Sequence, residues 1–269
     1  DGIDDLIIGA RLADPNGNSG AGESYVVFGG EGVGAGGALN LSSLNGTNGF
    51  VLNGIDAFDG SGYSVCSAGD VNGDGVDDLI IGANRADPNG NSNAGESYVV
   101  FGGVGVGASG ALNLSSLSGT NGFVLNGIDA GDYSGHSVSS AGDVNGDGVD
   151  DLVIGAFRAD LNGNSLAGES YVVFGGVGVG AGGALNLSSL IGANGFVLNG
   201  IDAGDYSGRS VSSAGDVNGD GVDDLIIGAW RADPNGQSLA GESYVVFGRN
   251  LSAPPPCPGN LNGDNIVNF

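Results

Sequence analysis

The chain has 269 residues, of which 40% are hydrophobic, so it can bury a sizeable core and is not expected to be disordered. It has 31 acidic residues against six arginines and no lysine, and the formal net charge of −25 argues against nucleic acid or an anionic membrane as a partner, because both are polyanions. The 58 glycines follow no Gly-X-Y repeat, which excludes collagen and favours a β architecture rich in turns.

The sequence repeats itself every 73 residues. This period aligns one set of four aspartates and one set of four tyrosines, namely Asp5, Asp78, Asp151 and Asp224, and Tyr25, Tyr98, Tyr171 and Tyr244. Such self-similarity is typical of repeat architectures, in which each unit buries its apolar faces against its neighbours. We therefore divide the chain into a first partial unit (1–54), two complete units (55–127 and 128–200) and a last partial unit (201–248).

Each complete unit contains four short apolar segments, which in the third unit are 137–141, 152–155, 170–174 and 196–198. They are rich in Val, Ile, Phe and Tyr, are bounded by Gly, Asp and Asn, and are too short for helices, so we predict four strands, A to D. The A–B connection carries an acidic cluster, and the B–C connection is a Pro/Gly turn. The long C–D connection contains a glycine-rich segment, such as 102–110, that we interpret as a loop.

Four strands per unit predict an all-β fold, a β-propeller of four-stranded antiparallel blades. The first unit supplies strands B to D, the two complete units supply A to D, and the last unit supplies A to C. This count corresponds to a partial ring of about 3.5 blades, and because the sequence begins inside a motif we expect it to be part of a larger ring. A parallel β-roll of calcium-binding nonapeptides is disfavoured, because a nine-residue period is missing.

Each complete A–B connection reads Asp-Val-Asn-Gly-Asp-Gly-Val-Asp-Asp, at 70–78, 143–151 and 216–224. Side-chain oxygens stand at positions 1, 3, 5 and 9, a backbone carbonyl is available at position 7, and the glycine at position 6 permits a sharp turn. The expected metal ligands are therefore Asp70, Asn72, Asp74, Val76 and Asp78; Asp143, Asn145, Asp147, Val149 and Asp151; Asp216, Asn218, Asp220, Val222 and Asp224; and, in the incomplete first cluster, Asp1, Ile3 and Asp5.

This donor set favours Ca²⁺, about one ion per complete loop. Zinc is disfavoured because no Cys or His lies in the loops, and Mg²⁺ because it prefers a small, rigid octahedron. An EF-hand is rejected, because position 12 of that loop should be a bidentate Glu and is here Ile81, Ile154 or Ile227, inside a predicted strand. The remaining alternative is a solvated acidic turn without metal.

The segment Ser134–Ala156 resembles the FG-GAP repeat of integrin α-subunit propellers and of related bacterial surface proteins, and the resemblance covers about residues 1–248. It implies a propeller with Ca²⁺ in the A–B loops and a role in adhesion or protein–protein binding. The chain departs from the family pattern at two places: the Phe of "FG" is Ser61, Ser134 or Ser207, and the Pro of "GAP" is Asn84, Phe157 or Trp230. The expected ligand positions match, so these departures concern the subfamily and the partner.

The C-terminal segment carries a second, weaker pattern. Residues 249–256 are proline-rich and are interpreted as a linker. Residues 257–269 resemble the opening of a dockerin or another EF-hand-like repeat, with weak metal-binding positions at Asn260, Asn262, Asp264 and Asn268, although the sequence stops before position 12.

We expect no catalytic residues and therefore no enzyme. The single histidine, His136, lies at a variable position without a repeated Ser or Cys partner, and the carboxylates recur identically in the units, whereas catalysis normally needs one asymmetric site. No segment is long and apolar enough to span a membrane. The predicted module is extracellular, either secreted or at the cell surface.

Partner specificity is expected where the units differ. These variable positions lie before strand A and after strand B, and they are Tyr63, His136 and Arg209, and Asn84, Phe157 and Trp230. The predicted partner is an extracellular protein or glycan. The alternative to an adhesion module is a non-catalytic propeller attached to a secreted enzyme, such as a hydrolase or phospholipase, or a carbohydrate-binding module.

Overall fold

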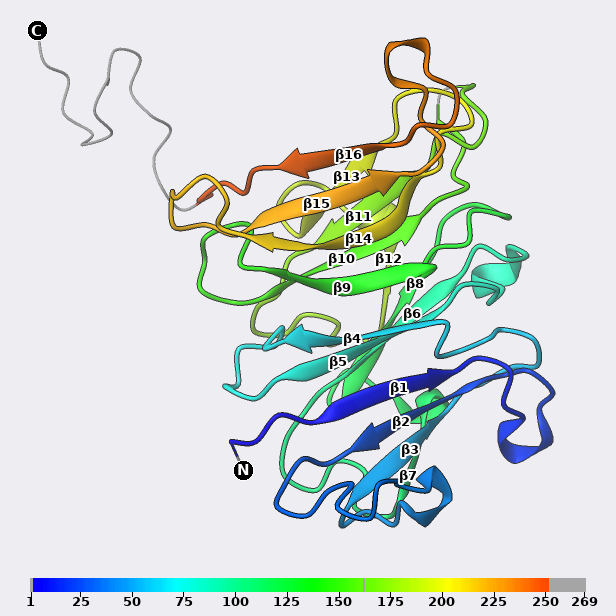
Figure 1. Ribbon diagram of the computed structural model, residues 1–269, viewed down its shortest axis with the longest axis vertical. Helices are drawn as coiled ribbons and strands as arrows, with labels where there is room; N and C mark the ends of the chain where they lie inside the picture. Colours follow the sequence, from blue (N-terminus) through cyan, green and yellow to red (C-terminus); the bar gives the residue numbers. More distant parts are fainter. Residues whose placement is uncertain (1, 162, 252–269) are drawn as a thin grey trace, which may run out of the picture.

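The computed structural model describes residues 2–161 and 163–251, and Figure 1 shows them as a stack of small sheets that follow one another from the N-terminal end to the C-terminal end. Strands and turns make up the described residues, together with short 3-10 helices, and no α-helix occurs among them. The 3-10 helices are η1 (Pro15–Gly17), η2 (Leu41–Ser43), η3 (Pro88–Gly90), η4 (Leu114–Ser116), η5 (Leu187–Ser189) and η6 (Pro234–Gly236).

The four sheets correspond to the four sequence units, and within each sheet the strands A to D pair antiparallel in chain order. The first unit consists of β1 (Leu6–Ala10), β2 (Glu23–Val27) and β3 (Gly49–Asn53). The second and third consist of β4 (Ser64–Gly69), β5 (Asp78–Ala83), β6 (Glu96–Val100) and β8 (Gly122–Asn126), and of β9 (Ser137–Gly142), β10 (Asp151–Ala156), β11 (Glu169–Val173) and β13 (Gly195–Asn199). The fourth consists of β14 (Ser207–Gly215), β15 (Asp224–Ala229) and β16 (Glu242–Val246).

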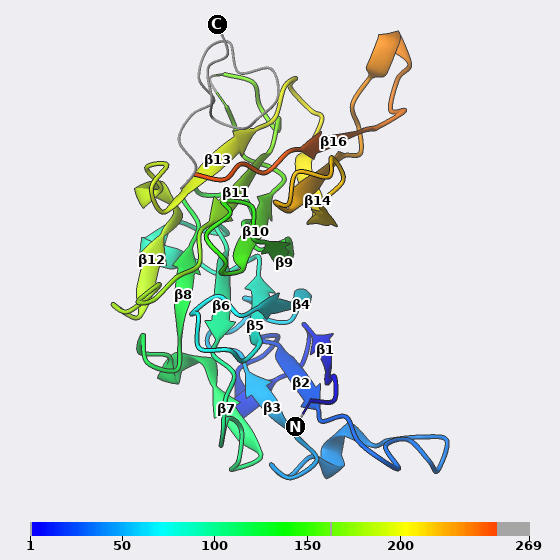
Figure 2. The ribbon, with the colours of Figure 1, turned by 90° about the vertical axis from the view of Figure 1, so that its left-hand side faces the viewer.

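The sheets form an open, partial β-propeller, as the sequence predicted. Inner strands of neighbouring blades contact one another, β1 with β4, β4 with β9 and β9 with β14. Figure 2 shows β4, β9 and β14 along one edge of the molecule, while β8 and two short outer strands, β7 (Ala111–Asn113) and β12 (Ala184–Asn186), lie along the opposite edge.

Two further strands lie in the C–D connections, which the sequence analysis treated as loops. These strands, β7 (Ala111–Asn113) and β12 (Ala184–Asn186), pair parallel with the outer strands β3 and β8 of the preceding blade. The sequence pattern missed them because three residues carry no periodicity and their partners belong to another unit. Asn53 Nδ2 donates to Asn113 Oδ1 at 2.9 Å, and Asn126 Nδ2 donates to Asn186 Oδ1 at 2.9 Å. Equivalent side-chain hydrogen bonds therefore connect both parallel strand pairs.

The core lies between the blades and not within one. On β5, Ile80 and Ile81 point to opposite faces, yet both have 0% of their surface exposed. Ile80 packs in one cluster with Ile154 of the following blade, and Ile81 in another with Val26 of the preceding blade. A strand buried on both faces reads as a continuous apolar run, which explains why the predicted strands show no alternation of polar and apolar residues.

Neighbouring repeats approach closely at one glycine of strand B in each of the first three units. A Cβ on Gly82 would lie 2.0 Å from the carbonyl oxygen of Gly135 in the next unit, and one on Gly155 would lie 1.9 Å from that of Gly208. A side chain at these positions would therefore push the blades apart, which gives a physical reason for the repeated Gly-Ala pair at the end of strand B.

Candidate functional site

The two groups of residues singled out in the sequence lie at opposite ends of the A–B hairpins. In the second blade, β4 and β5 pair antiparallel, with Gly69 opposite Asp78 at one end and Ser64 opposite Gly82 at the other. The acidic loop therefore closes the hairpin at one end, and the variable positions before strand A and after strand B lie at the open end. The same registers hold for β9 with β10 and for β14 with β15.

The first aspartate of each complete acidic loop organises the turn. The Asp70 carboxylate accepts hydrogen bonds from the backbone N–H groups of Gly73 (2.8 Å), Asp74 (3.0 Å) and Gly75 (2.8 Å). Asp143 and Asp216 accept the corresponding three bonds in their loops. At Asp216 these bonds lower the pKa of the carboxyl group, because they stabilise its charged form.

The ninth residue of each loop is a fully buried aspartate. The Asp78 carboxylate accepts from Val71 N (3.1 Å) and Gly102 N (2.8 Å), and Asp151 and Asp224 make the corresponding bonds, all three with 0% exposure. Burial raises the pKa of Asp78 to about 6 and that of Asp151 to about 7, although the backbone hydrogen bonds oppose this effect. A bound cation would reverse this penalty, because it favours the charged carboxylate.

The eighth aspartate, which the ligand pattern leaves unused, connects adjacent blades. Asp70 N donates to Asp150 Oδ2 of the next loop at 2.9 Å, and Asp150 N donates to Asp70 O at 3.3 Å. Asp223 makes the same pair of bonds to Asp143, at 3.0 and 3.2 Å. The recurrence of this aspartate was visible in the sequence, but its partner lies 80 residues away and could not be inferred from the loop itself.

The oxygen atoms of the second complete loop are suited to a metal ion, and one of them has no hydrogen-bond partner. In the second complete loop, Asn145 Nδ2 donates to Asp151 Oδ1 at 3.4 Å, while Asn145 Oδ1 is buried and has no hydrogen-bond partner. A buried oxygen without a partner is energetically unfavourable, and a cation would satisfy it. As the atoms stand in the described part of the chain, no three or more His, Cys, Asp or Glu side chains converge as a metal site.

The other expected ligands are placed as follows. Asp74 and Asp147 are exposed, and each accepts a bond from the backbone N–H two residues later. In the incomplete first cluster, Asp5 accepts from Gly29 N at 2.7 Å, as Asp78 does from Gly102, and Ile3 is 53% exposed. Asp1 lies outside the described residues, as do the weak positions Asn260, Asn262, Asp264 and Asn268.

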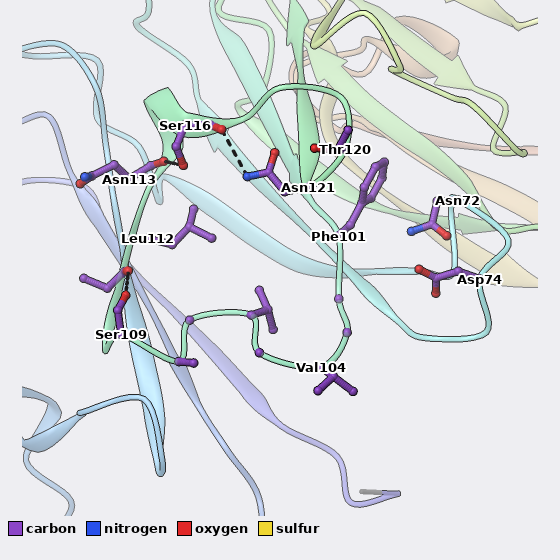
Figure 3. Close-up of a pocket in the computed structure, with 17 residues that line it drawn as sticks. Asn72, Asp74, Phe101, Val104, Ser109, Leu112, Asn113, Ser116, Thr120 and Asn121 are labelled. Carbon is purple, nitrogen blue, oxygen red and sulfur yellow. Dashed lines mark hydrogen bonds between the residues drawn. The ribbon is translucent and has the colours of Figure 1, made fainter.

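A broad hollow of about 910 Å³ adjoins the first complete loop. Figure 3 shows Asn72 and Asp74 on one side of this hollow and Asn113, Ser116 and Asn121 on the other, with Phe101 between them. The glycine-rich segment 102–110 forms part of its wall, so this segment is a loop, as expected, and lines a cavity beside the acidic loop.

The six variable positions come together around a second hollow of about 290 Å³, at the open ends of the hairpins. Its lining includes all six positions, Tyr63, His136, Arg209, Asn84, Phe157 and Trp230. Phe157 (7% exposed) and Asn84 (4%) lie deep, and Trp230 is 47% exposed. Five further residues line this hollow, namely Arg85, Tyr133, Arg158, Tyr206 and Arg231. Three of them are the arginine that directly follows the variable position after strand B, a recurrence that is visible in the sequence.

Comparison with known proteins gives three matches to the FG-GAP repeat, at residues 61–100, 134–173 and 207–246. The chain is 28% identical over 191 residues to integrin alpha-PS2 of Drosophila melanogaster, with 70% of this chain and 11% of the relative covered. It is 30% identical over 218 residues to integrin alpha pat-2 of Caenorhabditis elegans, with 77% and 16% covered, and 29% identical over 204 residues to integrin alpha-5 of Xenopus laevis, with 72% and 17% covered.

The chain thus spans less than a fifth of the length of these curated relatives. Within the residues that the structure describes, no helix has the length and apolar character to cross a membrane. The repeat matches begin just before strand A and end with strand C, so each contains one acidic loop and one pair of variable positions. The chain therefore contains three FG-GAP repeats, is similar to integrin α chains, and forms an open, partial β-propeller of that type.

Proposed function

We propose that this chain is a non-enzymatic, calcium-binding module for extracellular adhesion or protein–protein interaction, with Ca²⁺ held in the complete acidic loops. The single observation that carries the calcium assignment is the unpartnered, buried Asn145 Oδ1, which adjoins the buried carboxylate of Asp151. The extracellular role is supported by the likeness to integrin α chains.

Calcium binding would require only small rearrangements of the loop. The carboxylate of Asp78 is held by a hydrogen bond from Val71 N, and Asp74 is an exposed side chain that can rotate inward without disturbing the core. The Asp70 carboxylate is oriented by three backbone N–H groups and keeps further lone pairs for a cation. Calcium tolerates such irregular, oxygen-only coordination better than Mg²⁺ does. In this arrangement the chain's own oxygen atoms would bind the ion, and its positive charge would offset the repulsion among the carboxylates.

Calorimetric titration with Ca²⁺ and thermal unfolding test the proposal. We expect uptake of about one ion per complete loop and a lower melting temperature in chelator that millimolar Ca²⁺ restores, because a ligand that binds the native state stabilises it by about 2.7 kcal/mol at 100 times its Kd. Asp74→Ala should remove one ion from the stoichiometry. Asp77→Ala deletes the same charge from the same loop at a position that is not an expected ligand, and it should retain the ion. Absence of uptake by the unmodified chain would overturn the assignment.

A further inference from the structure

Most of the positive charge of this acidic chain lies in one place. Four of the six arginines, Arg85, Arg158, Arg209 and Arg231, line the 290 Å³ hollow at the open ends of the hairpins, and Arg11 lies over the ring of Tyr63 beside it. We call these residues and their aromatic neighbours the arginine–aromatic band. The sixth arginine, Arg249, lies elsewhere, where its backbone N–H donates to Val144 O beside the second acidic loop.

The band is a continuous series of tilted ring–ring contacts and ring–guanidinium contacts contributed by successive units. The Arg209 guanidinium lies 5.2 Å from the ring centroid of Phe157 and 5.1 Å from that of Trp230, so two rings flank it. Trp230 also contacts a second arginine, because the Arg231 guanidinium lies 4.5 Å from its ring centroid. On the other side of Phe157, His136 is 4.2 Å away, centroid to centroid. Ring faces hold a guanidinium through cation–π attraction and leave its planar N–H donors available.

We propose that the arginine–aromatic band binds an acidic peptide segment of a protein partner, with an Asp or Glu carboxylate received by Arg209 and its neighbour Arg231. This inference rests on the proposed role as an interaction module and names the chemistry of its partner. Arginine matches carboxylate geometry through paired N–H donors, and the exposed Trp230 offers an apolar contact beside the charge.

The size and lining of the hollow favour a peptide side chain over an extended acidic glycan. About 290 Å³ is at the lower limit for small-ligand sites and accommodates one or two side chains. The floor contains the nearly buried ring of Phe157. Asn84 lines the same hollow and keeps a buried Oδ1 without a hydrogen-bond partner, an acceptor that an N–H of the ligand would satisfy.

The carboxylates of the acidic loops do not cancel this local positive charge. The acidic loops lie at the far end of the hairpins, and the six residues of strand β5 span roughly 20 Å at about 3.3 Å per residue. This length exceeds the screening length of about 8 Å at physiological ionic strength. An anionic side chain at the band is therefore screened from the acidic loops. The carboxyl groups that lie near the band are represented by Asp132, whose backbone oxygen accepts from Arg158 N and whose pKa is raised to about 7 by burial, so that its negative charge is reduced at neutral pH.

The chain contains one tryptophan and one histidine, and both belong to the band, so each reports on it without a label. The probe is a blocked tetraglutamate peptide, compared with tetraglutamine, in chelator so that the acidic loops hold no divalent cation. We expect saturable binding of tetraglutamate by calorimetry and by Trp230 fluorescence, and none of tetraglutamine. The pKa of His136 is lowered to about 4 by burial and by the charges of Arg209 and Arg158, and its other neighbours are Tyr63, Asn84 and Phe157. A bound carboxylate should raise this pKa, which NMR of the single imidazole measures.

Arg209→Gln should weaken tetraglutamate binding about tenfold or more, because a charge-assisted hydrogen bond is lost. Arg249→Gln removes the same charge outside the band and should bind as the unmodified chain does. Arg209→Lys keeps the charge but loses the planar fork, and it should bind with intermediate affinity. Matching circular dichroism and melting curves establish that the variants are folded.

Three results would overturn the proposal: no binding of tetraglutamate, equal weakening by Arg209→Gln and Arg249→Gln, or binding of an oligogalacturonate of equal charge where tetraglutamate does not bind. The last result would assign the band to an acidic glycan. Because these measurements are made in chelator, a failure of calcium binding in the loops leaves their outcome unaffected, and the two proposals fail separately.

Discussion

Three positions of the acidic loop are occupied by the same residue type, aspartate, but their side chains have different physical roles. In the second complete loop, Asp143 orders the turn through backbone N–H groups, Asp150 bonds to the loop of the preceding blade, and Asp151 is buried beneath the loop. Asp150 and Asp151 are adjacent, so their side chains point in opposite directions on an extended segment. Sequence spacing therefore identified the motif, but only the surroundings of each carboxylate separate cross-blade bonding from ligand positions.

A second group of carboxylates is buried at the open ends of the hairpins, near Asp132 in the third unit. Asp132 is 7% exposed, and burial together with the negative charges of Asp129, Glu169 and Asp160 raises its pKa to about 7. Glu169 in turn accepts a hydrogen bond from Tyr171 Oη at 2.7 Å. These residues recur in the other units, and Asp59 has a pKa raised to about 7 for the same leading reason, burial.

We predict that Asp132→Asn stabilises the chain at pH 8. The folded-state pKa of about 7 exceeds the ordinary value of 3.8, so the stabilising contribution of Asp132 is fully present below about pH 4 and is lost as the pH rises to about 7. The asparagine stays neutral, and its gain in unfolding free energy should grow across that pH window to about 1–2 kcal/mol.

Denaturant unfolding in chelator at pH 4 to 8 measures this difference. Asp77→Asn is the control, because Asp77 is exposed and lies outside the group around Asp132, and its effect should vary little with pH. A stability difference for Asp132→Asn that is flat across the range would contradict the prediction.

At the scale of elements, the C–D connections tie each blade to the one before it. The glycine-rich loop of the third unit crosses the buried ring of Phe123 in the second blade, where a Cβ on Gly180 would lie 2.1 Å from the ring carbon Cγ. Strand β12 then pairs with β8, and Leu187 of η5 is buried at 1% exposure. The glycine content that suggested a simple loop is thus required for close packing between units.

We predict that Gly180→Ala destabilises the chain by at least about 2 kcal/mol more than Gly178→Ala, because overpacking against a fixed core ring adds to the strain of a positive φ. Gly178 is a matched control: its φ is +88°, that of Gly180 is +65°, and a Cβ on Gly178 would meet nothing within 4 Å. Urea unfolding of both variants tests the difference. Equal losses of stability would show that backbone strain alone governs these glycines.

At the scale of the molecule, both ends of the arc present strand faces that interior blades bury. Ile8 is 40% exposed, whereas its equivalent Ile81 is at 0%, and Ile226 is 39% exposed against 0% for its equivalent Ile80. The repeats therefore supply two interlocking faces, and each described blade depends on its neighbours for burial of apolar surface.

We expect solution scattering of this chain, extrapolated to zero concentration, to match an open arc whose blades follow one another as in Figure 1. A concentration series separates the single chain from associated species that cover the exposed end faces. A compact, closed ring at infinite dilution would contradict the expectation.

The sequence by itself determined the antiparallel strands A to D of the units, the position of the acidic loops and the location of the variable positions. These features depend on local patterns, namely short apolar runs, turn residues and a constant 73-residue period. The predicted strand at 152–155 and the observed β10 at Asp151–Ala156 differ by one residue at each end, because strand ends depend on hydrogen bonds rather than on apolar character.

Only the tertiary structure decided how the units combine. The parallel pairing of β7 and β12 with the preceding blade, the bonds of Asp150 to Asp70 and the assembly of the arginine–aromatic band all join residues of different units. Asn84 and His136, for example, are 52 residues apart and have nitrogen atoms 3.1 Å apart. Such contacts follow from the way twisted blades stack around a common axis, and no pattern within one unit contains that information.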